Sequence, residues 1–326
     1  MRWMLRPILL PLFRRDEGEV DAQARKFSVA SPEGRELVSG VGRAFLGGYN
    51  ATLAARAMGE VHAAGLAVAS HYRPFFFEGA AMGYLPRSLF TDSHGKARVE
   101  AELLEMDSRF RYLYNVGLGF WYGFRHPSRP AALEALAPHL DPFYFPLCYD
   151  GFGFKVGFFD VPGRPDARKV LDRAPAERRA EIYQGFGRSL FFVCMEDEAR
   201  FQKAKGQAPP EYRDDVESGR SLAVAFTGIS RPSGILQHLA RSSDAGELSL
   251  RLLGVTWALA AREMNDPDYF DACLSNLARE QQALLRRLPQ LCREALGTSS
   301  SYAMWRTKTR ASVTAAYAAS MEVLPR

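Results

Sequence analysis

The sequence predicts an all-α protein made of two copies of a helical unit of approximately 110–120 residues, joined in one pseudo-twofold domain. Apolar residues recur three and four positions apart along most of the chain, which is the period of a helix with one buried face. Alternating patterns typical of strands are nearly absent; the exception is 152–161, which could be an extended stretch or a short hairpin. Short phrases that occur twice in the same order suggest the duplication.

The separations between the repeated phrases decrease along the chain, as expected if the second copy has shorter loops. The pairs are "GVGRAFL" (40–46) and "GFGRSLF" (185–191), "EGAAM" (78–82) and "SGRSL" (218–222), and "DPFYFPLC" (141–148) and "DPDYFDAC" (266–273). The expected division is an N-terminal extension packed on the core (1–34), repeat 1 (35–155), a linker (156–179), repeat 2 (180–290) and a C-terminal helix (291–326).

The first predicted helix begins after Ser31, which can cap a first turn that opens with Pro32, and runs to about Ala64. A second glycine-containing helix is expected from about Pro175 to Met195. Glycine lowers helix propensity but lets another backbone come close, so these two helices are expected to cross each other, or equivalent partners, near the pseudo-twofold axis. The remaining helices are predicted at 78–85 (ended by Pro86), 97–124, 131–138, 215–228, 233–241, 246–263, 267–295 and 300–321.

Composition allows a large core and excludes one class of partner. Hydrophobic residues make up 47% of the 326 positions, and the 22 Phe and 13 Tyr could line a wide pocket or simply fill the core. The net charge is +5, but basic and acidic residues are interleaved, and "RTKTR" (306–310) is the one tight basic run. Because no basic stripe or known fold signature is present, we expect no binding to nucleic acid.

The N-terminal "MRWMLRPILLPLFRR" (1–15) is too short to span a membrane, and no apolar stretch near twenty residues follows elsewhere. We expect it to pack on the core; contact with a membrane surface or a partner protein is the alternative. A cytoplasmic protein is predicted. The four cysteines have no CxxC spacing and are expected to be small buried residues, not a disulfide or a nucleophile.

Four phrases give the sequence its character: "FFFEGAAMG" (75–83), "YDGFGFKVGFF" (149–159), "YQGFGRSLFF" (183–192) and "VESGRSLAVAFTG" (216–228). With "GRAFLGGYN" before them and "VGLGFWYG" between, the chain resembles, over roughly 35–265, the accessory proteins encoded with enediyne polyketide synthases (the UnbL-like group). That family has no known biochemical function. The resemblance implies bacterial secondary metabolism, with partner proteins of the same pathway, and processing of a long conjugated polyene.

Two positions depart from the pattern of that family. Phe77 stands where the family usually has a small residue, and Lys155 stands where it usually has His. If the His does chemistry in other members, the resemblance implies a different or lost activity in this chain.

Glu78 is a carboxylate in an apolar stretch, so it must be paired or carry a raised pKa. Arg43 and Arg188, the only charges in their glycine-rich phrases, are its expected partners; Asp215 and Glu217 are further candidate carboxylates for these arginines. A purely structural pair predicts a lowered pKa for Glu78, whereas a general acid or base facing a cavity predicts a raised one.

Asp150 and Lys155 flank the glycines of "DGFGFK", where they could serve a turn or reach the polar end of a ligand. We predict catalytic roles for Glu78, Arg188 and Lys155. The predicted ligand-binding residues, all from the same phrases, are Arg43, Phe77, Tyr149, Asp150, Phe154 and Gln184.

No metal site and no cofactor is predicted. HxxxH, ExxH and HExxH are absent, "RDDVES" (213–218) lacks the third acid of a diphosphate motif, and no Ser-His-Asp or dinucleotide signature is present. A lone His as a haem ligand stays open. The leading hypothesis is a protein that encloses a hydrophobic polyene-like molecule and acts on it by acid/base chemistry. The alternatives are a non-catalytic carrier or scaffold, and a relic whose pocket is closed.

Overall fold

The computed structural model describes residues 10–16, 18–27, 31–88, 98–195 and 197–317, and every regular element in this part of the chain is a helix. The predicted all-α class is therefore confirmed. The α-helices are α2 (Gly18–Ala24), α3 (Pro32–Ala54), α4 (Met58–Leu66), α5 (Arg73–Ser88), α6 (Val99–Leu104), α7 (Arg111–Arg125), α8 (Leu147–Lys155), α9 (Arg179–Cys194), α10 (Glu198–Gly206), α11 (Arg213–Gly228), α12 (Pro232–Ala240), α13 (Ala245–Asn265), α14 (Pro267–Leu274), α15 (Arg279–Gly297) and α16 (Tyr302–Tyr317). The 3₁₀ helices are η2 (Ser108–Phe110), η3 (Pro130–His139), η5 (Pro165–Arg173), η6 (Ala176–Arg178) and η7 (Pro210–Tyr212), and η4 (Val156–Asp160) is a π-helix.

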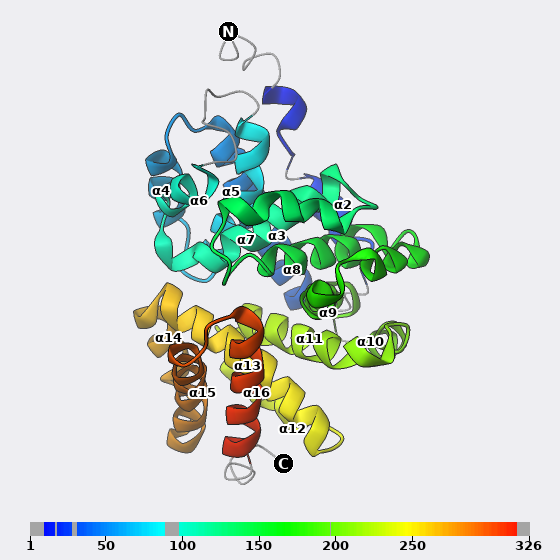
Figure 1. Cartoon of the computed structure of the whole chain (residues 1–326). Helices are drawn as coiled ribbons and strands as arrows, with labels where there is room; N and C mark the ends of the chain where they lie inside the picture. Colours follow the sequence, from blue (N-terminus) through cyan, green and yellow to red (C-terminus); the bar gives the residue numbers. More distant parts are fainter. Residues whose placement is uncertain (1–9, 17, 28–30, 89–97, 196, 318–326) are drawn as a thin grey trace.

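The core helices form a row in chain order. α3, α5, α7, α8, α9, α11 and α13 each pack against the next, and α15 and α16 cover α13. Figure 1 shows this progression, from blue and cyan α3, α5 and α7 above, through green α8 and α9, to yellow and red α12–α16 below. The shorter helices lie along the flanks of the row.

Glycines set the distance between successive helices of the row. Gly117, Gly151, Gly185 and Gly219 recur every 34 residues, and Gly254 follows 35 residues later. At each of them an added Cβ would clash with a backbone carbonyl oxygen of the preceding core helix. Only glycine allows backbones to come this close, so the glycine spacing reflects the stacking of one helix on the next.

This stacking gives the repeated phrases a structural reason. Gly79 in α5 and Gly219 in α11 make the same kind of contact, because each lies against a carbonyl of the preceding core helix. α11 is the fourth core helix after α5 in the row. By contrast, a Cβ added at Gly40 would contact the side chain of Tyr72, whereas one added at Gly185 would contact the backbone of Asp150. The two Gly-x-Gly-Arg phrases are therefore not equivalent in packing. α3 packs on α5 and α9 lies between α8 and α11, so each crosses its own sequence neighbours. The two-copy organisation and the domain division stay predictions.

The phrase beginning Asp-Pro also has a local explanation. Asp266 accepts a hydrogen bond from the backbone of Tyr269 at the start of α14, at 3.0 Å. Asp141 accepts one from the backbone of Phe143 just before α8, at 2.7 Å. Both phrases therefore carry the chemistry of a helix start.

Several predicted boundaries are wrong. The helix expected over 32–64 breaks at the extended residue Ala55, and the helix expected over 267–295 divides into α14 and α15. Pro86 lies inside α5 and does not end it. The stretch 152–161 is helical, first in α8 and then in η4. α8 is buried on all sides, so its sequence shows no amphipathic period.

Part of the N-terminal prediction, residues 1–9, lies outside the described residues, as does 318–326 of the C-terminal helix. Leu10 and Phe13 pack against the core, and the Tyr49 hydroxyl donates to the Phe13 carbonyl at 3.0 Å. Within the described ranges, no helix has both the length and the hydrophobicity that a membrane crossing requires.

The row curves, because residues from distant helices meet on its inner side. Arg188 of α9 lies 3.5 Å from Glu78 of α5, although α7 and α8 stand between these helices in the row. At one end, Arg262 of α13 donates to the carbonyl of His71, just before α5, at 3.0 Å. The inner side is therefore where functional side chains can converge.

Candidate functional site

The inner side of the curve is formed by residues one position before and three positions after the glycines of the row. Such pairs are four residues apart, so they lie on one face of each helix. The pairs at the centre are Glu78 and Met82 in α5, Val116 and Phe120 in α7, Asp150 and Phe154 in α8, and Gln184 and Arg188 in α9.

Arg188 joins two carboxylates. Its Nη1 donates to Asp150 Oδ1, and its Nη2 lies 3.5 Å from Glu78 Oε1. Gln184 Nε2 donates to the second oxygen of Asp150 at 3.1 Å. The guanidinium also lies over the ring of Phe154, 5.2 Å from its centre. The predicted pair of Glu78 with Arg188 is confirmed, and the structure brings five of the nine predicted site residues together.

The charges in this cluster do not balance if both acids are ionised. The side chains of Glu78 and Asp150 are 4% and 1% exposed, and a single guanidinium faces both. Burial raises the pKa of Glu78 to about 7; Arg188 opposes this rise and the charge of Asp150 adds to it. Burial also raises the pKa of Asp150, against the effect of Arg188. The cluster can therefore gain or lose a proton near neutral pH.

Sequence reasoning missed several polar side chains beside this cluster. The Tyr112 hydroxyl donates to Asn265 Oδ1 at 2.7 Å and is close enough to Arg262, Glu78 and Arg188 for their charges to influence its pKa, which burial raises. No sequence motif around Tyr112 indicates that its hydroxyl belongs to a polar site. Its place follows only from the curvature that brings α7 and α13 together.

A second buried arginine comes from the C-terminal helix. Arg306 donates to Glu181 at 2.8 Å and to Asp215 at 2.6 Å, and its guanidinium lies 5.4 Å from the ring centre of Trp257. Burial raises the pKa of Asp215 to about 6, against the effect of Arg306. The first residue of the basic run 306–310 is thus a buried partner of acids.

Arg262 is the third buried arginine of this side. It makes no ion pair with any described residue; instead it donates to the carbonyls of Phe226 at 2.7 Å and His71 at 3.0 Å. Its guanidinium lies 4.2 Å from the ring centre of Phe226. Burial lowers its pKa to about 10, so it stays charged at neutral pH. The sequence offered one indication of this role, since Arg262 is a cation near the end of a largely apolar helix.

Four predicted residues lie away from the cluster. Arg43 is a correction: it was expected to be buried against Glu78, Asp215 or Glu217, but its side chain is 52% exposed and faces Asp21 at 3.5 Å. α3 ends the row and has only α5 as a core neighbour; the short helix α2, which carries Asp21, also packs on α3 but leaves Arg43 half exposed.

Lys155 pairs with Asp160 at 2.8 Å and lies 4.9 Å from the ring centre of Phe124. It stands one position beyond Phe154, so it leaves the inner face of α8. The remaining two are buried in other packing: the Tyr149 hydroxyl donates to Glu134 at 2.8 Å, and Phe77 stacks on Phe110 with ring centres 4.4 Å apart.

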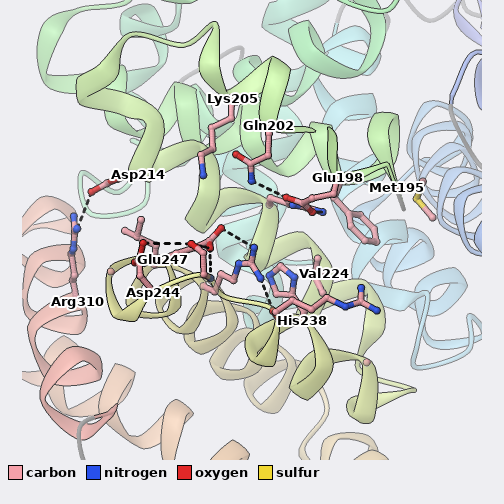
Figure 2. A pocket seen from close by; sticks show the side chains of 18 residues that line it. Met195, Glu198, Gln202, Lys205, Asp214, Val224, His238, Asp244, Glu247 and Arg310 are labelled. Carbon is pink, nitrogen blue, oxygen red and sulfur yellow. Dashed lines mark hydrogen bonds and ion pairs between the residues drawn. The ribbon is translucent and has the colours of Figure 1, made fainter. Parts of the chain in front are cut away.

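A separate groove of about 1150 Å³ lies between α9, α10, α11, α12 and α13, with Arg310 of α16 at one end. In Figure 2, Lys205 and Gln202 form one wall and Glu247, Asp244 and His238 lie opposite. Just below its surface Glu217 is fully buried and accepts hydrogen bonds from Lys205 at 2.6 Å and from Arg251 at 3.1 Å. No sequence motif pointed to this groove.

His238 is the one histidine of the groove lining. Its Nε2 lies 2.9 Å from the Ser221 hydroxyl, which also contacts the carbonyl of Glu217 at 3.0 Å. Burial, together with the charges of Arg251 and Arg220, lowers the pKa of His238 to about 3. The ring is therefore neutral at physiological pH and stands in a positive field.

Within the described ranges, no group of three or more His, Cys, Asp or Glu side chains could hold a metal ion. The four cysteines are free thiols; Cys273 is partly exposed and the other three are buried. Burial raises the pKa of the Cys292 thiol to about 12. The predicted burial is therefore confirmed for Cys148, Cys194 and Cys292 and is wrong for Cys273.

A family described as "Protein of unknown function (DUF1702)" matches residues 4–313. The chain belongs to this family. No curated protein and no solved structure matches the chain. Since the description of the family assigns no activity, function has to be argued from the inner cluster and the groove.

Proposed function

We propose that this chain is a protein of bacterial secondary metabolism that encloses a long hydrophobic, polyene-like molecule against the inner face of its helices. In this proposal Glu78 transfers a proton to or from that molecule, without a cofactor. The observation that carries the proposal is the arrangement of two buried carboxylates, Glu78 and Asp150, around the single guanidinium of Arg188.

The arrangement favours proton transfer over a purely structural pair. A structural pair with Arg188 predicts a lowered pKa for Glu78, but burial outweighs the arginine and raises the pKa to about 7. A general acid or base works best when its pKa lies near the pH at which it acts. Two acids that share one cation, with their proton affinities set by burial, form a common acid/base device.

The surroundings suit a hydrophobic ligand. Met82 and Phe154, on the inner face, each keep 8% of their surface accessible, whereas Leu118 and Phe152 on the neighbouring faces keep none. Trp257 lies on the same side of α13. A conjugated chain against this face would contact the ring of Phe154 and the thioether of Met82 directly beside the Glu78 cluster.

The chemistry requires only protons. Migration of a double bond along a conjugated chain needs a proton added at one carbon and another removed from a different carbon, so one carboxyl group can do both in turn. Arg188 would keep Asp150 ionised. The negative charge of Asp150 then favours the protonated form of Glu78, which can donate its proton to the ligand. Lys155 is given no part in this step, because its ammonium group pairs with Asp160 at 2.8 Å.

The resemblance to the enediyne accessory proteins supports the choice of a polyene, and it suggests partner proteins of the same pathway and a cytoplasmic location. The family match is coarser and names no pathway. A carrier that presents the polyene to a membrane or a redox partner is the second candidate. It is favoured by Gln184 Oε1, a buried acceptor with no partner in the described chain, which could bind a polar end of a ligand without any reaction.

The test combines ligand identification with one variant. Mass spectrometry of the protein purified from its native host should reveal a bound conjugated molecule, and parinaric acid, a fluorescent conjugated tetraene, serves as a probe for binding. Glu78→Gln should keep the melting temperature at pH 4.5, where Glu78 is protonated, and should keep the probe affinity, but it should lose conversion of the co-purified molecule. If this variant binds and converts like wild type, Glu78 is not the catalytic group and the carrier function replaces the proposal. If neither the host molecule nor the probe binds, both fail.

A further inference from the structure

The groove between α9 and α13 contains a buried hydrogen-bond donor that lacks an acceptor. Arg220, which lines the groove, has a side chain that is 8% exposed; its Nη2 pairs with Glu198 at 2.7 Å. Its guanidinium lies flat over Phe201, 3.9 Å from the ring centre. Its Nη1 has no hydrogen-bond partner among the described residues. A buried N–H group without an acceptor is unfavourable, so an acceptor from outside would stabilise this position.

A second guanidinium stands at the same end of the groove. Arg241 follows α12, is exposed, and makes no ion pair with any residue in the described ranges. Arg220, Arg241 and Arg251 all lie near enough to His238 for their charges to lower its pKa. Because Arg251 is neutralised by Glu217 and Glu247, the unbalanced positive charge comes from Arg241.

The two ends of the groove differ in charge and in polarity. Figure 2 shows Asp214, Asp244 and Glu247 at one end, and Met195, Val224, His238 and Glu198, the partner of Arg220, at the other. The apolar lining residues are Phe191, Met195, Val224 and Leu250. Three acids lie at the first end, whereas Glu198, the acid at the second end, is already paired with Arg220, and the exposed Arg241 stands there beside an apolar wall.

We propose that this groove is a binding site, separate from the inner face, for a small molecule with an anionic head group on an apolar chain. The head group, a carboxylate or a phosphate monoester, lies between Arg220 and Arg241 and accepts the free N–H of Arg220 Nη1. The chain lies along Phe191, Met195 and Val224. Arginine suits both head groups because its planar fork donates to two oxygens at once.

The experiment is isothermal titration of the full chain with three probes that share an octyl or similar chain: octanoate, octyl phosphate and the uncharged octyl glucoside. Binding of either anion, but not of the glucoside, is expected, and the tighter anion identifies the head group. Arg241→Gln, on the surface, should weaken the anion about tenfold, which corresponds to about 1.4 kcal/mol. Arg220→Gln should weaken it more, provided that this buried variant folds.

Two matched variants locate the site. Arg231→Gln removes an exposed arginine that does not line the groove, so it should bind octanoate like wild type. Glu78→Gln should also leave the affinity unchanged, since the inner face is a different place. The proposal is wrong if no anion binds, if the glucoside binds as tightly as the anions, or if Arg241→Gln has no effect. It is also wrong if Glu78→Gln, and not Arg241→Gln, removes binding.

Discussion

Glu78 and Glu217 are both buried glutamates in core helices, and they are neutralised differently. Glu217 is fully buried and contacts two cations, Lys205 at 2.6 Å and Arg251 at 3.1 Å, of which Arg251 also pairs with Glu247. Glu78 has one cation, Arg188 at 3.5 Å, and shares it with Asp150. Glu217 therefore faces two cations, whereas Glu78 and Asp150 share one.

The difference separates a structural charge from a reactive one. A buried carboxylate with two close cations stabilises the fold by keeping those cations paired. A buried carboxylate that shares one cation with a second acid has a raised pKa, so it can exchange a proton near neutral pH. Burial alone therefore does not mark a functional acid; the count of nearby charges does.

The largest effect is expected for Glu217→Ala, which leaves Lys205 and Arg251 without their shared partner. Removing one member of a buried ion pair typically costs about 3–5 kcal/mol, and urea denaturation should show a loss of this size in the free energy of unfolding. Glu211→Ala, at an exposed position of η7, is the control and should change little. Equal stability of the two variants would show that Glu217 does not stabilise the fold.

The next effect is a dependence of stability on pH that comes from Glu78. Its folded pKa of about 7 lies above the ordinary 4.5, so the folded protein holds this proton more tightly than the unfolded chain. The resulting stabilisation is fully present below pH 4.5 and is lost as the pH rises through about 7, by about 3 kcal/mol.

Glu78→Gln cannot titrate at this position, so its stability relative to wild type should rise over the same interval. Urea denaturation of both proteins at pH 4.5, 6 and 8 measures the difference, and titration of Asp215, common to both, cancels. A constant difference across this range would show that Arg188 holds Glu78 ionised.

A smaller effect is expected for Gly185→Ala. The added methyl would clash with the carbonyl of Asp150 and push α9 away from α8, which should cost about 1–3 kcal/mol and reduce the pH effect of Glu78. Gly59→Ala is the matched control, because no atom lies within 4 Å of its added Cβ. It should stabilise α4 by about 0.5–1 kcal/mol. A Gly185→Ala variant that behaves like the control would show that close helix contact does not support the cluster.

The sequence predicted the helical class and the pairing of Glu78 with Arg188, because each follows from local chemistry. Helical periodicity is readable in a window of residues, and isolated opposite charges in apolar phrases must meet when buried. It did not predict the position of Arg43, although the phrase around it matches the phrase around Arg188. The two helices have different numbers of neighbours, and a short phrase does not encode that.

The 34-residue spacing of Gly117, Gly151, Gly185 and Gly219 was present in the sequence, but the longest repeated phrases favoured a period near four times as large. Tyr112, Arg262 and Arg306 were missed for a further reason. They reach the inner side only because the row of helices curves, and curvature is the sum of many packing angles that no single stretch specifies. The groove was missed in the same way, since its walls come from separate helices.

The order of packing along the row also has a consequence for how the chain folds. Each core helix touches mainly the helices next to it in sequence, as in proteins made of stacked units, so these contacts close short loops and can form early and independently. The bond from Arg262 to the carbonyl of His71 joins positions 191 residues apart, and that from Arg109 to the carbonyl of Asn265 joins positions 156 apart. Closing such long loops costs more chain entropy, so these contacts should form last. The chain would then pass through a stage in which its helices are stacked but the buried acids still face water, and only the final bending would give Glu78 its high proton affinity.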